Sequence, residues 1–195
     1  MRNSGVVRLL GLALFLIVGC YPYERHVRLS YATPAGAGAR FDGHGSPIVV
    51  TNFLDQRPDR KVIGRISSAA VVTAEPVTAD NDPGQWVADA IRTELAHGNY
   101  AILPDGQPAP QGVFTIDGTL IKAFSTASGN YTADVVFEAR ISKDGHPVFS
   151  RRYSGHGDKG AMVAGSPELM ADALSDALGH AVDQFLTDFQ QATAK

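Results

Sequence analysis

The most regular pattern of hydrophobic and polar positions lies in the middle of the chain. From Tyr131 to Ile141 every second residue is apolar, and the residues between them are mainly polar. A period of two is typical of a strand with one buried face. The segment Phe114–Leu120 shows a similar alternation, and Pro147–Ser154 follows Asp144-Gly145, a dipeptide typical of a type I′ hairpin turn. Together they predict an antiparallel meander whose apolar face needs a cover.

Two other segments carry apolar residues at steps of three and four, the spacing of a helix with one buried side. The first starts at Asp82-Pro83, which suits an N-cap and first turn, and ends at Gly98, where we expect a left-handed C-cap. The second starts at Ser166-Pro167. Its stripe consists of Leu169, Met170, Ala173, Leu174, Ala177, Leu178, Ala181, Val182, Phe185, Leu186 and Phe189. This stripe predicts a core helix, and a partner-binding helix is the alternative.

Shorter strands precede the meander. Pro47–Phe53 is rich in β-branched residues, and Val62–Ile66 follows after a turn. The order of strand, helix, meander and helix predicts an α+β fold of two layers. This domain comprises residues 47–195, and in it two helices pack on one face of a mostly antiparallel sheet. Hydrophobic residues make up 44% of the 195, which is enough for one ordinary core.

The N-terminus has the features of a processing signal. Arg2 and Arg8 precede the apolar segment Leu9–Val18, which is too short to cross a bilayer and has the size of a signal-peptide core. The residues Leu16-Ile17-Val18-Gly19-Cys20 resemble the lipobox of bacterial lipoproteins. That resemblance implies that residues 1–19 are removed and that Cys20 carries diacylglycerol and an N-acyl chain. These covalent lipids would anchor the protein to a membrane.

Residues 20–46 are expected to form the lipidated N-terminus and a flexible tether, because they are rich in Pro, Gly and Ala. Within them, the alternation of Val27, Leu29 and Tyr31 predicts a short strand at 25–31. Tyr21 follows the cysteine, where lipoproteins retained in the inner membrane of enteric bacteria usually have Asp. The resemblance to lipoproteins therefore implies the outer membrane, at its periplasmic face.

The order of elements and several short motifs resemble the YajG family of bacterial lipoproteins. The motifs are Asp55-Gln56-Arg57, Val62-Ile63-Gly64, a helix ending in Gly98-Asn99-Tyr100, the hairpin from Gly129 to Gly145, and Tyr153-Ser154-Gly155 before the last helix. More loosely, the chain resembles auxiliary lipoproteins of ABC-type transport systems. The YajG resemblance implies an outer-membrane lipoprotein with no established enzyme activity.

The net charge and the residue types limit the functions that we expect of this chain. The net charge of −3 becomes −5 once Arg2 and Arg8 are removed, which argues against a nucleic-acid partner. Cys20 is the single cysteine, and no two histidines have the helical spacing of a zinc motif. A G-x-S-x-G nucleophile motif is absent. We therefore expect no enzyme activity, no metal and no cofactor other than the covalent lipid.

Two pairs of residues are candidate partner contacts. Asp55 and Arg57 are expected to form a local salt bridge that fixes a turn, with a partner contact as the alternative. Arg151 and Arg152 are expected to face water on an edge strand, where charge discourages sheet extension. Either that strand or Pro47–Phe53 is a candidate exposed edge to which a partner adds a strand.

Three hypotheses of function follow. The first is a non-enzymatic binding or scaffolding module, anchored by lipid and contacting an envelope protein of unknown identity. The second is an auxiliary lipoprotein subunit of an ABC-type lipid or solute transport system, which needs an apolar groove between helices and sheet or a docking face. The third is an enzyme such as a cell-wall hydrolase, which needs a cleft with perturbed carboxylates or histidines.

Overall fold

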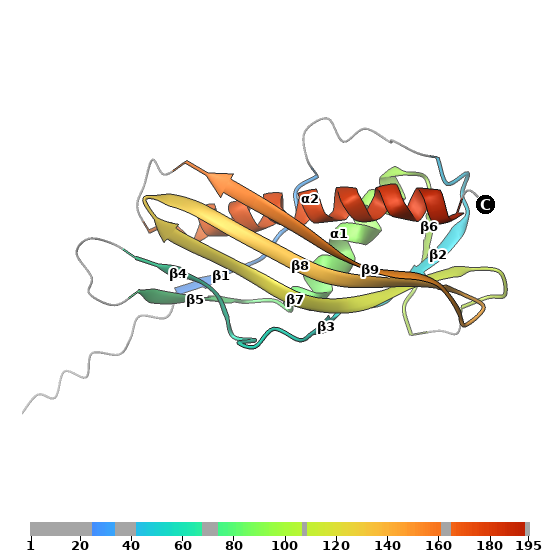
Figure 1. The fold of residues 1–195 in the computed structure, drawn as a ribbon, viewed down its shortest axis with the longest axis horizontal. Helices are drawn as coiled ribbons and strands as arrows, with labels where there is room; N and C mark the ends of the chain where they lie inside the picture. The colour runs from blue at the N-terminus through green and yellow to red at the C-terminus, as the bar shows by residue number, and fades with distance from the viewer. Residues whose placement is uncertain (1–24, 34–41, 68–73, 107–108, 161–164, 194–195) are drawn as a thin grey trace, which may run out of the picture.

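Three long antiparallel strands form the centre of the molecule (Figure 1). The computed structural model describes residues 25–33, 42–67, 74–106, 109–160 and 165–193. The long strands are β7 (Phe114–Ser128), β8 (Asn130–Lys143) and β9 (His146–Lys159). Asp144 and Gly145 join β8 to β9 with φ angles of 52° and 76°, as a type I′ turn requires. The predicted meander is confirmed, and its strands extend beyond the predicted ends.

Short strands complete a mixed sheet on the other side of β7. The strands β2 (Pro47–Val50), β3 (Leu54–Asp55) and β4 (Val62–Ile66) pair in parallel with successive parts of β7. The remaining strands are β1 (Arg25–Val27), β5 (Glu75–Ala79) and β6 (Ala101–Leu103), and the order β1-β5-β4 forms one end of the sheet. Because β2 lies between β6 and β7, the prediction that Pro47–Phe53 is an exposed edge is wrong.

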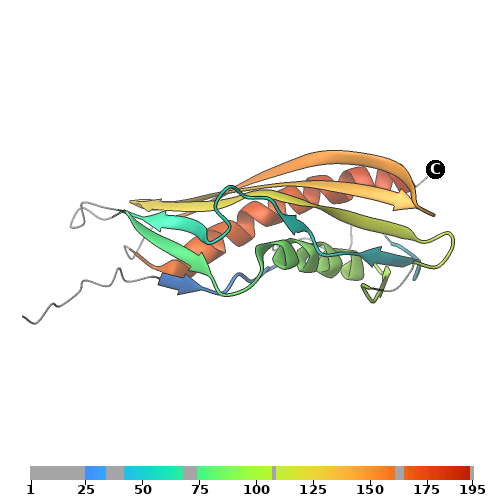
Figure 2. The ribbon, with the colours of Figure 1, turned by 90° about the horizontal axis from the view of Figure 1, so that it is seen from below.

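Both helices lie on the same side of the long strands (Figure 2). The helix α2 (Pro167–Thr193) packs along β7, β8 and β9, and α1 (Pro83–His97) contacts α2, β2, β3, β6 and β7. Most large side chains of the α2 stripe, among them Leu178 and Phe185, are fully buried, and Leu169 at its start is partly buried. The α+β fold with two helices on one face is therefore confirmed, and α2 is a core helix.

At the ends of α1, the predicted N-cap is confirmed and the predicted C-cap is wrong. Asp82 caps the helix, accepting hydrogen bonds from the amides of Gly84 and Gln85. At the other end the predicted left-handed Gly98 is wrong, since its φ is −79° and Asn99 takes the left-handed conformation with φ 59°. Asn99 holds this conformation while its amide donates to Asp42 Oδ1 at 2.9 Å. Asparagine tolerates the left-handed region better than most residues.

The folded part of the chain begins earlier than Pro47. Val27 and Leu29 are buried, and Asn81 accepts a hydrogen bond from the Leu29 amide at 2.8 Å. The Tyr31 hydroxyl donates to Glu94 Oε1 at 2.8 Å, which attaches this segment to α1. Residues 25–33 are thus part of the domain rather than of a tether, because their alternating apolar side chains pack into the core and their polar groups bond to residues far away in the sequence. Cys20 and the rest of the expected tether up to residue 41 lie outside the described residues.

Candidate binding surfaces

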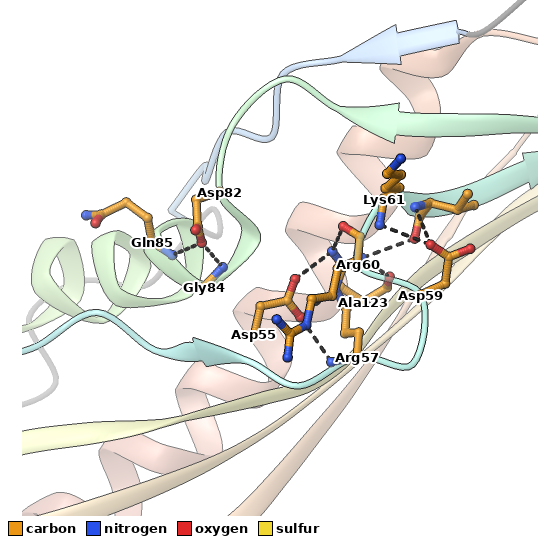
Figure 3. Close-up of polar contacts among 10 residues, drawn as sticks. Asp55, Arg57, Asp59, Arg60, Lys61, Asp82, Gly84, Gln85 and Ala123 are labelled. Carbon is orange, nitrogen blue, oxygen red and sulfur yellow. Dashed lines mark hydrogen bonds and ion pairs between the residues drawn. The ribbon is translucent and has the colours of Figure 1, made fainter.

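The loop between β3 and β4 is held by Arg57, which is 4% exposed (Figure 3). Its Nε and Nη2 donate to the Asp55 carboxylate at 3.0 and 2.9 Å. The remaining hydrogens point at carbonyl oxygens of Val62, Ala123 and Arg60. The expected local salt bridge is present, and together with the three carbonyl contacts it occupies every donor of the guanidinium. A partner would have to break these buried bonds to contact Arg57.

Asp59 closes the same loop from outside (Figure 3). Its Oδ1 accepts hydrogen bonds from the amides of Lys61 and Val62 at 3.0 and 3.1 Å. These two backbone hydrogen bonds hold the pKa of Asp59 below its usual range. The carboxylates of Asp55 and Asp59 therefore accept hydrogen bonds from groups of their own loop. These bonds hold the charged loop in one conformation.

A groove of about 430 Å³ lies between this loop and the outer face of β7. Its lining is mainly apolar and comprises Arg57, Pro58, Asp59, Val62, Ile121, Lys122, Ala123 and Phe124. The register of β7 and β8 shifts between Leu120 and Lys122, so that Ile121 has no partner residue in β8. Such a bulge changes which residues face outward. Sequence alternation did not identify this groove, because the pattern carries no sign of where a bulge falls.

Charged side chains cross the strands on the outer face beside this groove. Lys122 and His156 both contact the Asp134 carboxylate, at 2.8 and 2.9 Å. Their hydrogen bonds lower the pKa of Asp134, with Lys122 as the larger cause. Arg140 pairs with Asp117 at 2.7 Å in the same way. These are cross-strand ion pairs on a solvated surface, where each contributes little to stability.

The other predicted pair, Arg151 and Arg152, lies on β9, which among the described strands pairs with β8 alone. Arg151 donates to Asp188 of α2 at 2.8 Å, and Arg152 reaches Glu138 of β8 at 3.8 Å. The prediction that both face water on an edge strand is confirmed. A cleft of about 240 Å³ runs beside them, lined by Arg151, Arg152, Tyr153, Gln184, Thr187 and Asp188.

Tyr153 joins this cleft to the core. Its hydroxyl donates to Asp188 Oδ2 at 3.0 Å, and its ring packs against Phe137 and Phe185. Burial raises the pKa of Tyr153, and the Asp188 carboxylate raises it further. The phenol is thus a neutral donor that fixes Asp188 beside Arg151. Sequence reasoning did not connect Tyr153 with Asp188, because they lie 35 residues apart in the chain.

Within the ranges described, no group of three or more His, Cys, Asp or Glu side chains is arranged to hold a metal ion. The helices of that same part of the chain include none that is long and apolar enough to cross a membrane.

The fold occurs in other solved structures. Protein XCC0632 from Xanthomonas campestris, described with the family DUF330, matches with a TM-score of 0.56 and 13% identity, over 87% of this chain and 99% of that one. A second, uncharacterised protein matches with a TM-score of 0.53 and 13% identity, over 84% and 99%. At such identities the likeness concerns the fold alone. No family model and no curated protein matches the sequence.

Proposed function

We propose that this chain is an outer-membrane lipoprotein of the YajG type that works without catalysis, as a periplasmic binding or scaffolding module of the cell envelope. The observation that carries the proposal is the position of Cys20. It ends the lipobox only five residues before Arg25, where the described fold begins. A lipid on Cys20 would therefore hold a folded domain directly at the membrane.

The start of β1 is firmly attached to the domain. Arg25 Nε donates to Glu75 Oε2 at 2.8 Å, and its Nη1 donates to the carbonyl oxygen of Gly165. Five peptide steps span at most about 18 Å in any conformation. The lipid anchor would thus keep this end of the domain within that distance of the bilayer surface. The C-terminal end of α2, at the far side of the molecule in Figure 1, would point into the periplasm.

The proposal that the module is non-enzymatic is supported by the state of its charged groups. Charged groups that line the groove and the cleft already contact other groups of this chain, as Arg57 contacts Asp55 and Asp188 contacts Arg151 and Tyr153. A general acid or base needs a free position for a substrate proton. Surfaces of paired charges beside apolar side chains suit binding better than proton transfer.

The anchor is tested by replacing Cys20 in cells fed with labelled palmitate. We expect label on the wild type in the outer-membrane fraction, and an unlabelled, uncut precursor for Cys20→Ser. Tyr21→Asp is the matched control, which should stay labelled and move to the inner membrane of an enteric host. An unlabelled wild type that fractionates like Cys20→Ser would overturn the anchor. A labelled Tyr21→Asp that remains in the outer membrane would overturn the sorting argument only.

The apolar groove favours a second candidate, an auxiliary subunit of an ABC-type lipid or solute transport system. The groove lies on the outer face of the sheet rather than between helices and sheet, where Gly155 and Gly157 let α2 pack directly on β9. Its volume of about 430 Å³ is within the range of small-molecule sites, roughly 300–1,000 Å³. An acyl chain would fit its apolar lining.

This candidate is tested by extracting the non-covalent lipids that co-purify with the protein and identifying them by mass spectrometry. Phe124→Asp places a charge in the groove and should remove them. Thr126→Asp, an exposed position of the same strand outside the groove, should keep them. Equal lipid in both variants would exclude the groove as a lipid site. Crosslinking in intact cells, followed by mass spectrometry, would name a permease neighbour if there is one.

A further inference from the structure

The outer edge of β9 is covered along only part of its length. The Ser154 carbonyl accepts a hydrogen bond from Gln184 Nε2 at 2.9 Å, and the His156 carbonyl lies 2.7 Å from His180 Nδ1. Both partners belong to α2, which packs closely on this half of the strand. Side chains of α2 therefore take the place of a neighbouring strand there.

The half of β9 that includes Ser150 and Arg152 differs. The register with β8 is regular from Phe149 to Lys159, so Ser150 and Arg152 point their main-chain groups in the same direction as Ser154. That direction is away from β8, toward the free edge. None of the hydrogen bonds found among the described residues joins α2 to the main chain of these two residues. The cleft of about 240 Å³ lies alongside.

Two arginines present positive charge on both faces of this open edge. Arg151 lies on the α2 side, with 66% of its side chain exposed, and Arg152 lies on the outer face, with 64% exposed. Arg152 reaches its acidic neighbour Glu138 only at 3.8 Å. An antiparallel second copy centred near Arg151 would bring like charges together, and like charges on adjacent strands are destabilising. The charge therefore favours an acidic strand over a second copy.

We infer that the Ser150–Arg152 edge of β9 accepts an extended segment of a partner protein by strand addition, and that this segment carries neighbouring acidic residues. The main-chain groups of Ser150 and Arg152 would supply the hydrogen bonds. Acidic side chains on opposite faces of the added strand would meet Arg151 and Arg152. The inference is independent of the lipid anchor and of the apolar groove.

The test uses the purified mature protein in mild detergent and three synthetic peptides. The probe is Thr-Val-Glu-Glu-Val-Thr, and its controls carry Lys-Lys in place of Glu-Glu or N-methyl groups on alternate amides. We expect the acidic peptide to bind at least about tenfold more tightly than either control, a difference of one decade in Kd. Hydrogen exchange of the amides at 149–153 should slow when it binds.

Variants of the protein distinguish the contribution of charge to peptide binding from that of main-chain hydrogen bonds. Ser150→Pro removes an outward amide, and Arg152→Gln removes a charge at the edge, so both should weaken binding. Arg140→Gln is the matched control, an arginine with a similarly exposed side chain on the outer face of the interior strand β8. Equal binding of the N-methylated peptide, equal loss in Arg140→Gln, or no binding of the acidic peptide would overturn the inference. So would a dimer in sedimentation that Ser150→Pro abolishes, which would make a second copy the occupant.

Discussion

Gly155 of β9 lies directly against the backbone of Ala177 in α2. A Cβ at position 155 would come within 1.9 Å of the Ala177 carbonyl oxygen, and one at Gly157 within 2.1 Å of the Ala173 oxygen. Two residues of a strand rise about 6.7 Å, and four residues of a helix rise about 6 Å. The glycines and alanines therefore stay matched as the two elements run side by side. This contact keeps the α2 side chains close to one half of the β9 edge.

The first prediction concerns this contact. Gly155→Ala should destabilise the protein by about 1–3 kcal/mol or more, because the added methyl group meets backbone that cannot rotate away. The measurement is the midpoint of urea unfolding followed by circular dichroism.

Gly160→Ala is the matched control for the first prediction. Gly160 follows the end of β9, and a Cβ there meets nothing within 4 Å. We expect little change in stability for this variant. Equal stability of Gly155→Ala and Gly160→Ala would show that α2 and β9 are not in close contact.

The second prediction separates a structural from a partner role for Asp55 and Arg57. Removing one member of a buried ion pair typically costs about 3–5 kcal/mol. Arg57→Ala should cost more than Asp55→Ala, since Arg57 also satisfies the carbonyl oxygens of Val62 and Arg60. The free energies of unfolding of both variants, from urea titration at pH 7, check this order.

Arg60→Ala serves as the control in that comparison, because Arg60 is an exposed arginine of the same loop. It should leave the free energy of unfolding almost unchanged. If Arg57→Ala unfolds at the same urea concentration as Arg60→Ala, the buried network does not stabilise the loop, and the partner interpretation of Arg57 gains support.

The third prediction uses the Tyr31–Glu94 hydrogen bond. Burial raises the pKa of Tyr31, and the Glu94 carboxylate raises it further. An unfolded tyrosine ionises near pH 10, about its ordinary pKa. Stability from neutral Tyr31 is therefore fully present below that pH and is lost as the pH rises above it. Tyr31→Phe should show a smaller loss of stability between pH 9 and pH 11 than the wild type.

Tyr153→Phe is a useful second variant, because Tyr153 also has a raised pKa. Its ionisation should account for part of the loss of stability at high pH that remains in Tyr31→Phe. At pH 7, Tyr31→Phe should cost about 1 kcal/mol, the usual value of one hydrogen bond. Unchanged alkaline behaviour of Tyr31→Phe would contradict the attachment of residues 25–33 to α1.

Prediction from sequence worked where neighbours in the chain decide the structure. The period of two in β8, the Asp144-Gly145 turn and the Asp82 cap each act within a few residues. The Asp55–Arg57 salt bridge belongs to the same class, since its partners are two positions apart. For Arg151 and Arg152 the positive charge itself indicated an edge strand, because charged side chains at an edge discourage further strand pairing.

The contacts that shape the groove, the cleft and the β9 edge join residues far apart in the sequence, and local patterns did not predict them. The β7 bulge at Ile121, the docking of residues 25–33 on α1 and α2, and the parallel pairing of β2, β3 and β4 with β7 join segments far apart in the chain. Local patterns cannot specify such pairings, because the free energy that selects them comes from burial shared by the whole core. The sequence by itself determined the helices and the meander. Only the tertiary structure decided where the groove and the cleft lie, and which part of the β9 edge receives hydrogen bonds from α2 among the described residues.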